Sequence, residues 1–216
     1  VAVKRNQIAD DKIGVFRPAF EEMGRLAKTH PEELVLGLLK SGFAATCYDG
    51  QYFFDSDHPV TNAGGGVASV SNMQSGSGDA WFLLDTSRGI KPVIWQQREE
   101  YAFQALVRDN DPSVFFNDEF TYGVRARANA GYGLWQLAFG SKAELTAANY
   151  AAARAAMMNF RADGGRVLGI KPTVMVVPPS LESAALTLLN TETKDGGGSN
   201  PWRDTCELIV SPFIAE

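Results

Sequence analysis

The stretch PAFEEMGRLAKTHPEELVLGLLKS, residues 18–41, predicts a long kinked α-helix. Pro18 suits a first helical turn, and apolar side chains then recur on one face at Phe20, Met23, Leu26 and Ala27. Thr29 can cap a continuation of the helix that tolerates Pro31, and Ser41-Gly42 is a usual helix end. The sequence therefore predicts one long helix with an apolar face over residues 18–41.

The segments beside this helix predict strands and a loop. Residues 1–8 alternate apolar and polar side chains, as a half-exposed strand does. Residues 43–54 place aromatic side chains around Asp49-Gly50, which is typical of a hairpin or short strands. Residues 55–80 contain two glycine-rich runs and few apolar side chains, so we expect an exposed flexible loop.

The remaining chain alternates strands with two helices. Strands are expected in an antiparallel, meandering sheet over residues 81–84, 93–96, 102–107, 120–127 and 132–139. The C-terminal third predicts a helix over 147–160, a buried strand over 174–177, a helix over 181–189 with Ser180 as its N-cap, a mobile loop at 195–200 and a strand at 208–210. The fold class is therefore α+β.

Composition excludes several classes of protein. The net charge is −5 and the basic residues are scattered, which is unsuited to tight binding of a phosphate backbone. The sequence has no apolar run long enough to span a membrane and no signal-peptide pattern, so we expect a soluble protein that is cytoplasmic where it is made. Cys47 and Cys206 are expected to stay reduced. Both ends look cut from a longer chain, since Val1 is not an initiator methionine.

One cluster points to catalysis. Asp55, Asp57 and His58 lie within four residues and offer ligands for a divalent cation, which keeps a metal-dependent hydrolase open as an alternative. A polar turn is the competing interpretation, because the chain has only 2 histidines and no companion motif for further ligands. The glycine runs lack the Lys-Ser/Thr of a phosphate loop, and no serine lies in a nucleophile elbow. No catalytic, cofactor-binding or metal residue is therefore assigned, and no cofactor is expected.

A second cluster favours contact with another subunit. Trp202 follows a glycine-rich loop and stands beside charged residues, so it is either an exposed interface anchor or a packing residue. The candidate assembly interface comprises Gly196, Gly197, Gly198, Asn200, Trp202 and Arg203.

Several motifs, in order along nearly the whole chain, resemble one family. They are Val-x-Val-x-Arg-Asn-x-Ile-x-Asp-Asp at residues 1–11, Tyr48-Asp49-Gly50 with Phe53-Phe54 and Asp57-His58-Pro59, and Trp81-Phe82-Leu83-Leu84-Asp85-Thr86-Ser87. Two more are Asn129-Ala130-Gly131-Tyr132-Gly133-Leu134-Trp135-Gln136-Leu137-Ala138 and Pro172-x-x-x-Val176-Val177-Pro178-Pro179-x-Leu181-Glu182. The set is similar to the major head subunit, gpT, of Mu-like bacteriophages.

The resemblance implies the tailed-phage major capsid fold named for phage Hong Kong 97. That fold has an extended loop, a long spine helix, a peripheral domain with a sheet, and an axial domain. Residues 1–12 correspond to the returning strand of the extended loop, and residues 13–144 to the spine helix and peripheral domain, with the flexible loop 55–80. Residues 145–216 correspond to the axial domain.

The implied function is structural and not enzymatic. A major capsid protein self-assembles into the icosahedral shell around phage double-stranded DNA, and its partners are copies of itself in hexamers and pentamers, with portal, scaffold and decoration proteins. The DNA is enclosed without sequence-specific binding, and no membrane is involved. The expected location is the virion capsid, and the host cytoplasm during assembly. A capsid decoration protein, which binds preformed shells, is the other alternative beside the hydrolase.

Overall fold

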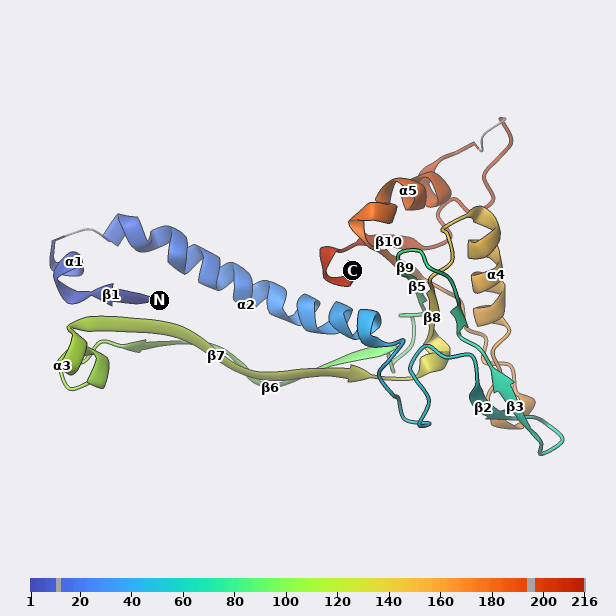
Figure 1. Cartoon of the computed structure of the whole chain (residues 1–216), viewed down its shortest axis with the longest axis horizontal. Coiled ribbons are helices and arrows are strands. Elements are labelled where there is room, and N and C mark those ends of the chain that lie inside the picture. Colours follow the sequence, from blue (N-terminus) through green and yellow to red (C-terminus); the bar gives the residue numbers. More distant parts are fainter. Residues whose placement is uncertain (11–12, 194–196, 216) are drawn as a thin grey trace. The chain divides into compact units, whose positions relative to one another are not determined.

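A computed structural model describes residues 1–10, 13–193 and 197–215. The chain divides into two compact units, each built from two segments of sequence (Figure 1). Unit 1 comprises Val1–Leu34 and Trp95–Asn129, and unit 2 comprises Val35–Ile94 and Ala130–Glu216. Helix α2 (Ile13–Ser41) and strands β6 (Val93–Leu106) and β7 (Glu119–Tyr132) each contribute residues to both units.

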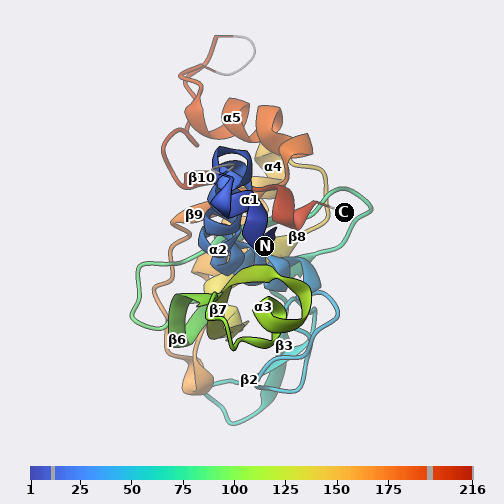
Figure 2. The same ribbon diagram turned by 90° about the vertical axis from the view of Figure 1, so that its left-hand side faces the viewer.

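Unit 1 contains a three-stranded sheet in the order β1-β7-β6. Strand β1 (Ala2–Lys4) pairs antiparallel with β7, and the short helices α1 (Arg5–Ala9) and α3 (Pro112–Asn117) follow β1 and β6. Helix α3 lies where the chain turns back from β6 into β7 (Figure 2). Tyr122 on β7 contacts Phe20 of α2 edge-on at 5.1 Å, and this contact holds the helix against the sheet.

Unit 2 is built on a mixed five-stranded sheet in the order β10-β9-β5-β8-β4. Its strands are β4 (Met73–Gln74), β5 (Trp81–Leu84), β8 (Ala138–Ser141), β9 (Val174–Val177) and β10 (Glu207–Val210). Strand β5 is antiparallel to both β8 and β9, whereas the outer pairs β10–β9 and β4–β8 are parallel. Helix α4 (Ala147–Met158) contacts β8, and α5 (Glu182–Asn190) contacts β10 (Figure 1).

The hydrophobic core lies in unit 2. Trp81, Phe82 and Leu83 of β5 and Met175 and Val177 of β9 are fully buried, because both faces of these central strands are covered. Four-residue apolar runs of this kind are the expected signature of a strand without a solvent face. The predictions for β5 and β9 are confirmed by the structure.

Helix predictions were correct in kind and differed at their ends. Helix α2 begins at Ile13, before the predicted residue 18, so Pro18 and Pro31 both lie inside it. Helix α4 ends at Met158, and the side chain of Thr146 caps it by accepting a hydrogen bond from the Asn149 amide. The prediction that Ser180 caps α5 was wrong, because its hydroxyl donates to Asp79 instead.

Two strand predictions and one loop prediction were wrong. The strand expected over residues 1–8 ends at Lys4, because helical hydrogen bonding begins with α1 and Asp10 N–H donates to Asn6. The loop 55–80 contains β4 and the hairpin of β2 (His58–Thr61) with β3 (Val67–Val70), closed by Asn62 and Gly65. The expected strand 132–139 is broken by a 3₁₀ turn at Trp135–Leu137. Local helical hydrogen bonding accounts for the first and third differences, and strand pairing accounts for the second.

The expected single meander is replaced by two separate sheets. Strand β5 pairs with β8 and β9, while β6 and β7 form their own sheet with β1. Residues 11–12 and the start of the expected mobile loop at 195–200 lie outside the described residues. Within those residues, no helix has both the length and the apolar character needed to cross a lipid bilayer.

Candidate functional site

His58 on β2 is buried in a polar network and is not part of an open metal site with Asp55 and Asp57. Its side chain is 0% exposed, and the ring stacks on Trp135 with centroids 4.0 Å apart. Its Nδ1 lies 2.7 Å from Asp49 Oδ2. Asp55 instead accepts hydrogen bonds from the backbone N–H groups of Tyr52 and Ser56. The carboxylate that the structure places beside His58 is therefore that of Asp49, and not that of Asp55 or Asp57.

Asn72 fixes the other edge of the His58 ring. Its amide nitrogen donates to the carbonyl oxygen of Phe53 at 2.8 Å, which leaves Oδ1 as the acceptor. Oδ1 accepts from Asp55 N–H at 2.9 Å and faces His58 Nε2 at 3.2 Å. Since both ring nitrogens face oxygen acceptors, the imidazole is held from two sides. The cluster thereby ties the residues around the Asp49-Gly50 turn to β2.

Cys47 completes this network. Its thiol donates to Asp49 Oδ1 at 3.1 Å, and the ligand atoms of Cys47, Asp49 and His58 all lie within 4.8 Å of one another. Burial raises the pKa of the Cys47 thiol to about 11, and the neighbouring carboxylate adds to this. Burial acts to raise the pKa of Asp49, but hydrogen bonds from Cys47, His58 and the Gln51 amide outweigh it, so this pKa lies below its ordinary value. These groups satisfy one another as a structural brace.

The sequence contained only part of the signal for this network. The sequence predicts a turn at Asp49-Gly50, and nothing local links Asp49 to His58 or Asn72. Tertiary pairing of β2 with β3 and the stacking on Trp135 bring them together. His58 is grouped with Cys47 and Asp49 and not with Asp55 and Asp57. The hydrolase alternative built on Asp55, Asp57 and His58 is therefore wrong.

The predicted interface loop is packed at one end and exposed at the other. Trp202 is half-buried and meets the Tyr150 ring edge-on at 5.4 Å, while Gly197 and Gly198 are exposed. Gly196 lies outside the described residues. Asn200 bonds the carbonyl oxygens of Leu188 and Thr191, and Arg203 pairs with Glu192 at 2.6 Å, Nη1 to Oε1.

A pocket of about 490 Å³ adjoins Asn200 and Trp202. Its other lining residues are mostly small or apolar and come from the start of α4 and from α5 and the segment after it (Leu145, Ala147, Ala184, Thr187, Leu188, Thr191 and Thr193). Of the interface candidates, Asn200 and Trp202 thus line a concave surface.

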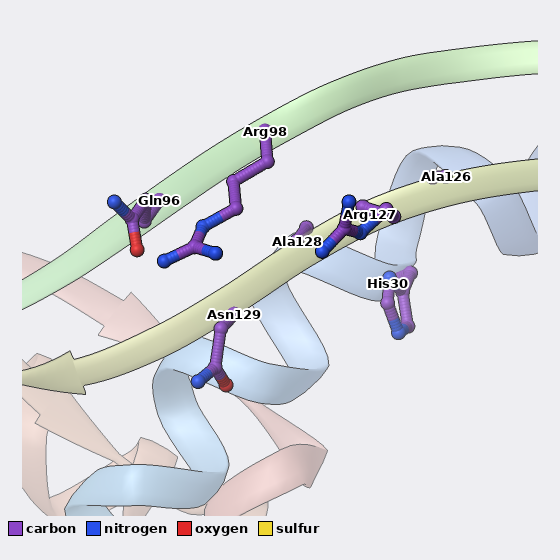
Figure 3. A pocket seen from close by; sticks show the side chains of 7 residues that line it. All are labelled: His30, Gln96, Arg98, Ala126, Arg127, Ala128 and Asn129. Atoms are coloured by element: carbon purple, nitrogen blue, oxygen red, sulfur yellow. The ribbon is translucent and has the colours of Figure 1, made fainter.

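A basic pocket in unit 1 was not indicated by the sequence. It encloses about 490 Å³ and is lined by His30 of α2, Gln96 and Arg98 of β6, and residues 126–129 of β7, including Arg127 (Figure 3). The His30 ring is held by Tyr101, whose hydroxyl lies 2.7 Å from Nδ1. Arg98 and Arg127 are separated in sequence by the whole hairpin. Only the pairing of β6 with β7 could reveal this pocket.

Unit 1 also exposes large apolar side chains. Phe115 and Phe116 of α3 are 73% and 78% exposed, and Phe103, Leu106 and Val15 are exposed as well. Large exposed apolar patches mark contact surfaces. The polar network around His58 is satisfied internally and unit 1 exposes large apolar side chains, which is the character of a structural subunit that contacts other copies.

The comparisons with known proteins identify the family. Residues 1–214 match the Mu-like prophage major head subunit gpT family, and the chain belongs to it. It is 47% identical to the Mu-like prophage FluMu major head subunit of Haemophilus influenzae and 42% identical to the major capsid protein of Escherichia phage Mu. Each of these alignments covers 99% of this chain and 73% of the relative.

Solved capsid structures agree with this assignment. The bacteriophage JBD30 procapsid subunit superposes with a TM-score of 0.85 at 44% identity, over 99% of this chain and 73% of the other. The JBD30 capsid decorated with minor capsid protein trimers gives a TM-score of 0.82 at 31% identity, over 99% and 72%. The chain therefore has the Hong Kong 97-type capsid fold and is a major capsid protein, a structural component of the virion and not an enzyme. The decoration-protein alternative was wrong.

Proposed function

We propose that copies of this subunit form hexamers and pentamers that close into an icosahedral shell around double-stranded DNA. The observation that carries the proposal is the uneven burial of the two units. Unit 1 leaves Phe103, Phe115 and Phe116 exposed, and these side chains are available for contacts with neighbouring copies. In a closed shell each subunit meets several others, so many individually weak contacts add up.

We also propose roles for the parts of the chain. Helix α2 is the spine helix, unit 1 contains the peripheral sheet, and the returning strand of the extended loop, assigned to residues 1–12, is limited to β1. Residues 145–216 belong to the axial domain, and all of them lie in unit 2. The segment 13–144, assigned to spine helix and peripheral domain, includes β5 and β8, which pair with each other and, through β5, with β9. That pairing argues for placing both strands with the axial domain.

The proposed partners are inferred from the net charge of the subunit and from the related JBD30 capsid. The JBD30 capsid carries minor capsid protein trimers, and we propose that this shell likewise receives decoration proteins, and portal and scaffold proteins during assembly in the host cytoplasm. A net charge of −5 favours enclosing DNA without sequence-specific binding, because the inner wall then repels the phosphate backbone. We propose no contact with a membrane.

The residues Gly196, Gly197, Gly198, Asn200, Trp202 and Arg203 are proposed as an assembly interface. Trp202 is half-buried beside a pocket of about 490 Å³, so its outer edge is available to a neighbouring copy. Trp202→Ala tests this contact, with thermal melting measured in parallel because the ring also packs on Tyr150. Reduced capsomer formation at an unchanged melting temperature supports the interface, and unchanged capsomer formation contradicts it.

The first test of the whole proposal is assembly of the purified full-length subunit. Size-exclusion chromatography and negative-stain electron microscopy distinguish rings and closed shells from monomers. Five-fold and six-fold rings or closed shells are expected. A subunit that stays monomeric across concentration and salt, and enters shells only when preformed shells are added, would contradict self-assembly.

A further inference from the structure

The basic pocket of unit 1 carries an excess of positive charge. None of its seven lining residues is acidic, and two are arginines (Figure 3). Glu99 is the nearest partner to this charge, and it is shared: its Oε1 lies 3.3 Å from Arg127 Nη1 and its Oε2 lies 3.6 Å from Arg125 Nη2. One carboxylate thus faces two guanidinium groups.

Arg98 adds a further charge that is not compensated. Within residues 1–10, 13–193 and 197–215, no carboxylate forms an ion pair with Arg98. It stands on β6 beside Glu99 in sequence, but neighbouring strand residues point to opposite faces, and Glu99 is turned to Arg125 and Arg127. The Arg98 side chain points toward the side of the pocket lined by Asn129 (Figure 3).

We propose that this pocket is a receptor for a carboxylate side chain of a neighbouring copy of the same subunit. A guanidinium presents paired N–H donors in a plane that match the two oxygens of a carboxylate. The pocket volume of about 490 Å³ admits an entire Asp or Glu side chain with part of its backbone. In the shell, an arriving carboxylate balances the charge of Arg98, which forms no ion pair with a carboxylate of the described residues.

Charge decides between a carboxylate and a nucleic acid as the occupant. The subunit carries 25 acidic against 20 basic residues, so a neighbouring copy presents many carboxylates. Surfaces that bind a phosphate backbone use several basic side chains along a stripe with an overall positive field. Here Glu99 and Glu100 follow Arg98 directly, and the net charge is −5. A single carboxylate fits this local field better than a polyphosphate does.

Charge reversal at Arg98 is the first test, made in the full-length subunit. Arg98→Glu places like charges together at the contact, and we expect the subunit concentration needed for half-maximal assembly to rise roughly tenfold or more. Arg98→Gln should give a smaller rise. Arg108→Glu is the matched control, because Arg108 is an exposed arginine of unit 1 that does not line the pocket.

Two further measurements distinguish loss of the Arg98 contact from a general loss of stability or a general change in charge. Arg98 is exposed, so the monomer should melt at the same temperature in all three variants. The wild-type advantage over Arg98→Glu should also shrink as salt is raised, since exposed ion pairs are screened. Assembly of Arg98→Glu at the wild-type concentration would overturn the proposal, and so would an equal loss in Arg108→Glu.

Cross-linking identifies the occupant. Arg98→Lys keeps the charge and supplies an amine that a carbodiimide couples to a carboxylate in contact with it. In shells mixed from ¹⁵N-labelled and unlabelled subunits, we expect a cross-linked peptide that joins position 98 of one isotope to an Asp or Glu of the other. Cross-links confined to Glu99 or Glu100 of the same copy would refute the proposal. Normal assembly of Arg98→Glu with less retained DNA would refute it in favour of a phosphate occupant.

Discussion

The two units of this capsid subunit differ in how they are stabilised. Unit 2 contains every buried apolar side chain of the described residues except Val3 and Val114, which belong to unit 1. Unit 1 is held by strand pairing, a few aromatic contacts and exposed ion pairs, which contribute little individually. Unit 2 thus resembles an ordinary globular core. Unit 1 is suited to receive further stabilisation from neighbours in the shell.

Core truncation should separate the units most clearly. Trp81 in β5 is 0% exposed, and its indole N–H donates to Ala143 at 2.8 Å. Trp81→Ala should lower the free energy of unfolding by about 3–5 kcal/mol, because it leaves a cavity and an unpaired carbonyl. Chemical denaturation of the monomer measures this. Phe116→Ala in unit 1 is the control and should change stability by less than about 0.5 kcal/mol. Equal losses of stability in Trp81→Ala and Phe116→Ala would show that the two units do not differ in how they are stabilised.

A buried carboxylate gives the next largest expected effect. Asp85 is 1% exposed and accepts hydrogen bonds from Ser87 N–H at 3.0 Å and from Lys171 N–H at 3.2 Å. Asp85→Asn replaces one acceptor oxygen by a donor and should destabilise unit 2 by about 1–3 kcal/mol. Asp109→Asn, at an 83% exposed side chain paired with Arg5, should cost less than about 0.5 kcal/mol. A larger loss for Asp109→Asn than for Asp85→Asn would reverse the ranking of the units.

Acidification should weaken unit 2. Burial acts to raise the pKa of Asp85, but hydrogen bonds from Ser87 and Lys171 and the nearby Arg88 outweigh it, so this pKa lies below its ordinary value, as does that of Asp49. A carboxyl with a lowered folded-state pKa stabilises the fold above its unfolded pKa, near 4, and loses this contribution as pH falls through the folded value. Stability of unit 2 should therefore decline below about pH 4.

Melting followed by near-ultraviolet circular dichroism tests this acid response. Trp81 and Trp135 report on unit 2, and Trp95 belongs to unit 1. In Asp85→Asn the decline with acid should be smaller than in the wild type, because one of the two titrating groups is gone. An identical loss of stability with acid in Asp85→Asn and in the wild type would show that Asp85 does not contribute to the acid response.

The smallest effect concerns the thiols, both of which lie in unit 2. A thiol pKa of about 11 leaves Cys47 almost wholly protonated at pH 8, so alkylation should be about 100-fold slower than for a thiol at its ordinary pKa. Burial also raises the pKa of Cys206. Iodoacetamide labelling followed by mass spectrometry measures both. Labelling at the rate of a free thiol peptide would show that the Cys47–Asp49 contact opens readily.

The sequence by itself was sufficient for elements with a local signal. The helix over 18–41 and the helix at Ala147 follow from side-chain period and end residues, and the buried strands 81–84 and 174–177 follow from short apolar runs. The family was recognisable because its motifs recur in order from residue 1 to residue 182. Each of these signals depends on residues that are close together in the chain.

Only the tertiary structure decided which distant residues meet. Strand β5 has the same local pattern whether it joins β6 or β9, and the pairing with β9 is settled by packing across the whole of unit 2. His58 lies one residue from Asp57 yet pairs with Asp49, because burial against Trp135 turns the ring inward. Arg98 and Arg127 share a pocket since β6 and β7 return along each other. The periodicity of apolar side chains along the sequence determines local conformation. Pairings between distant residues depend on the burial and hydrogen bonding of the complete fold.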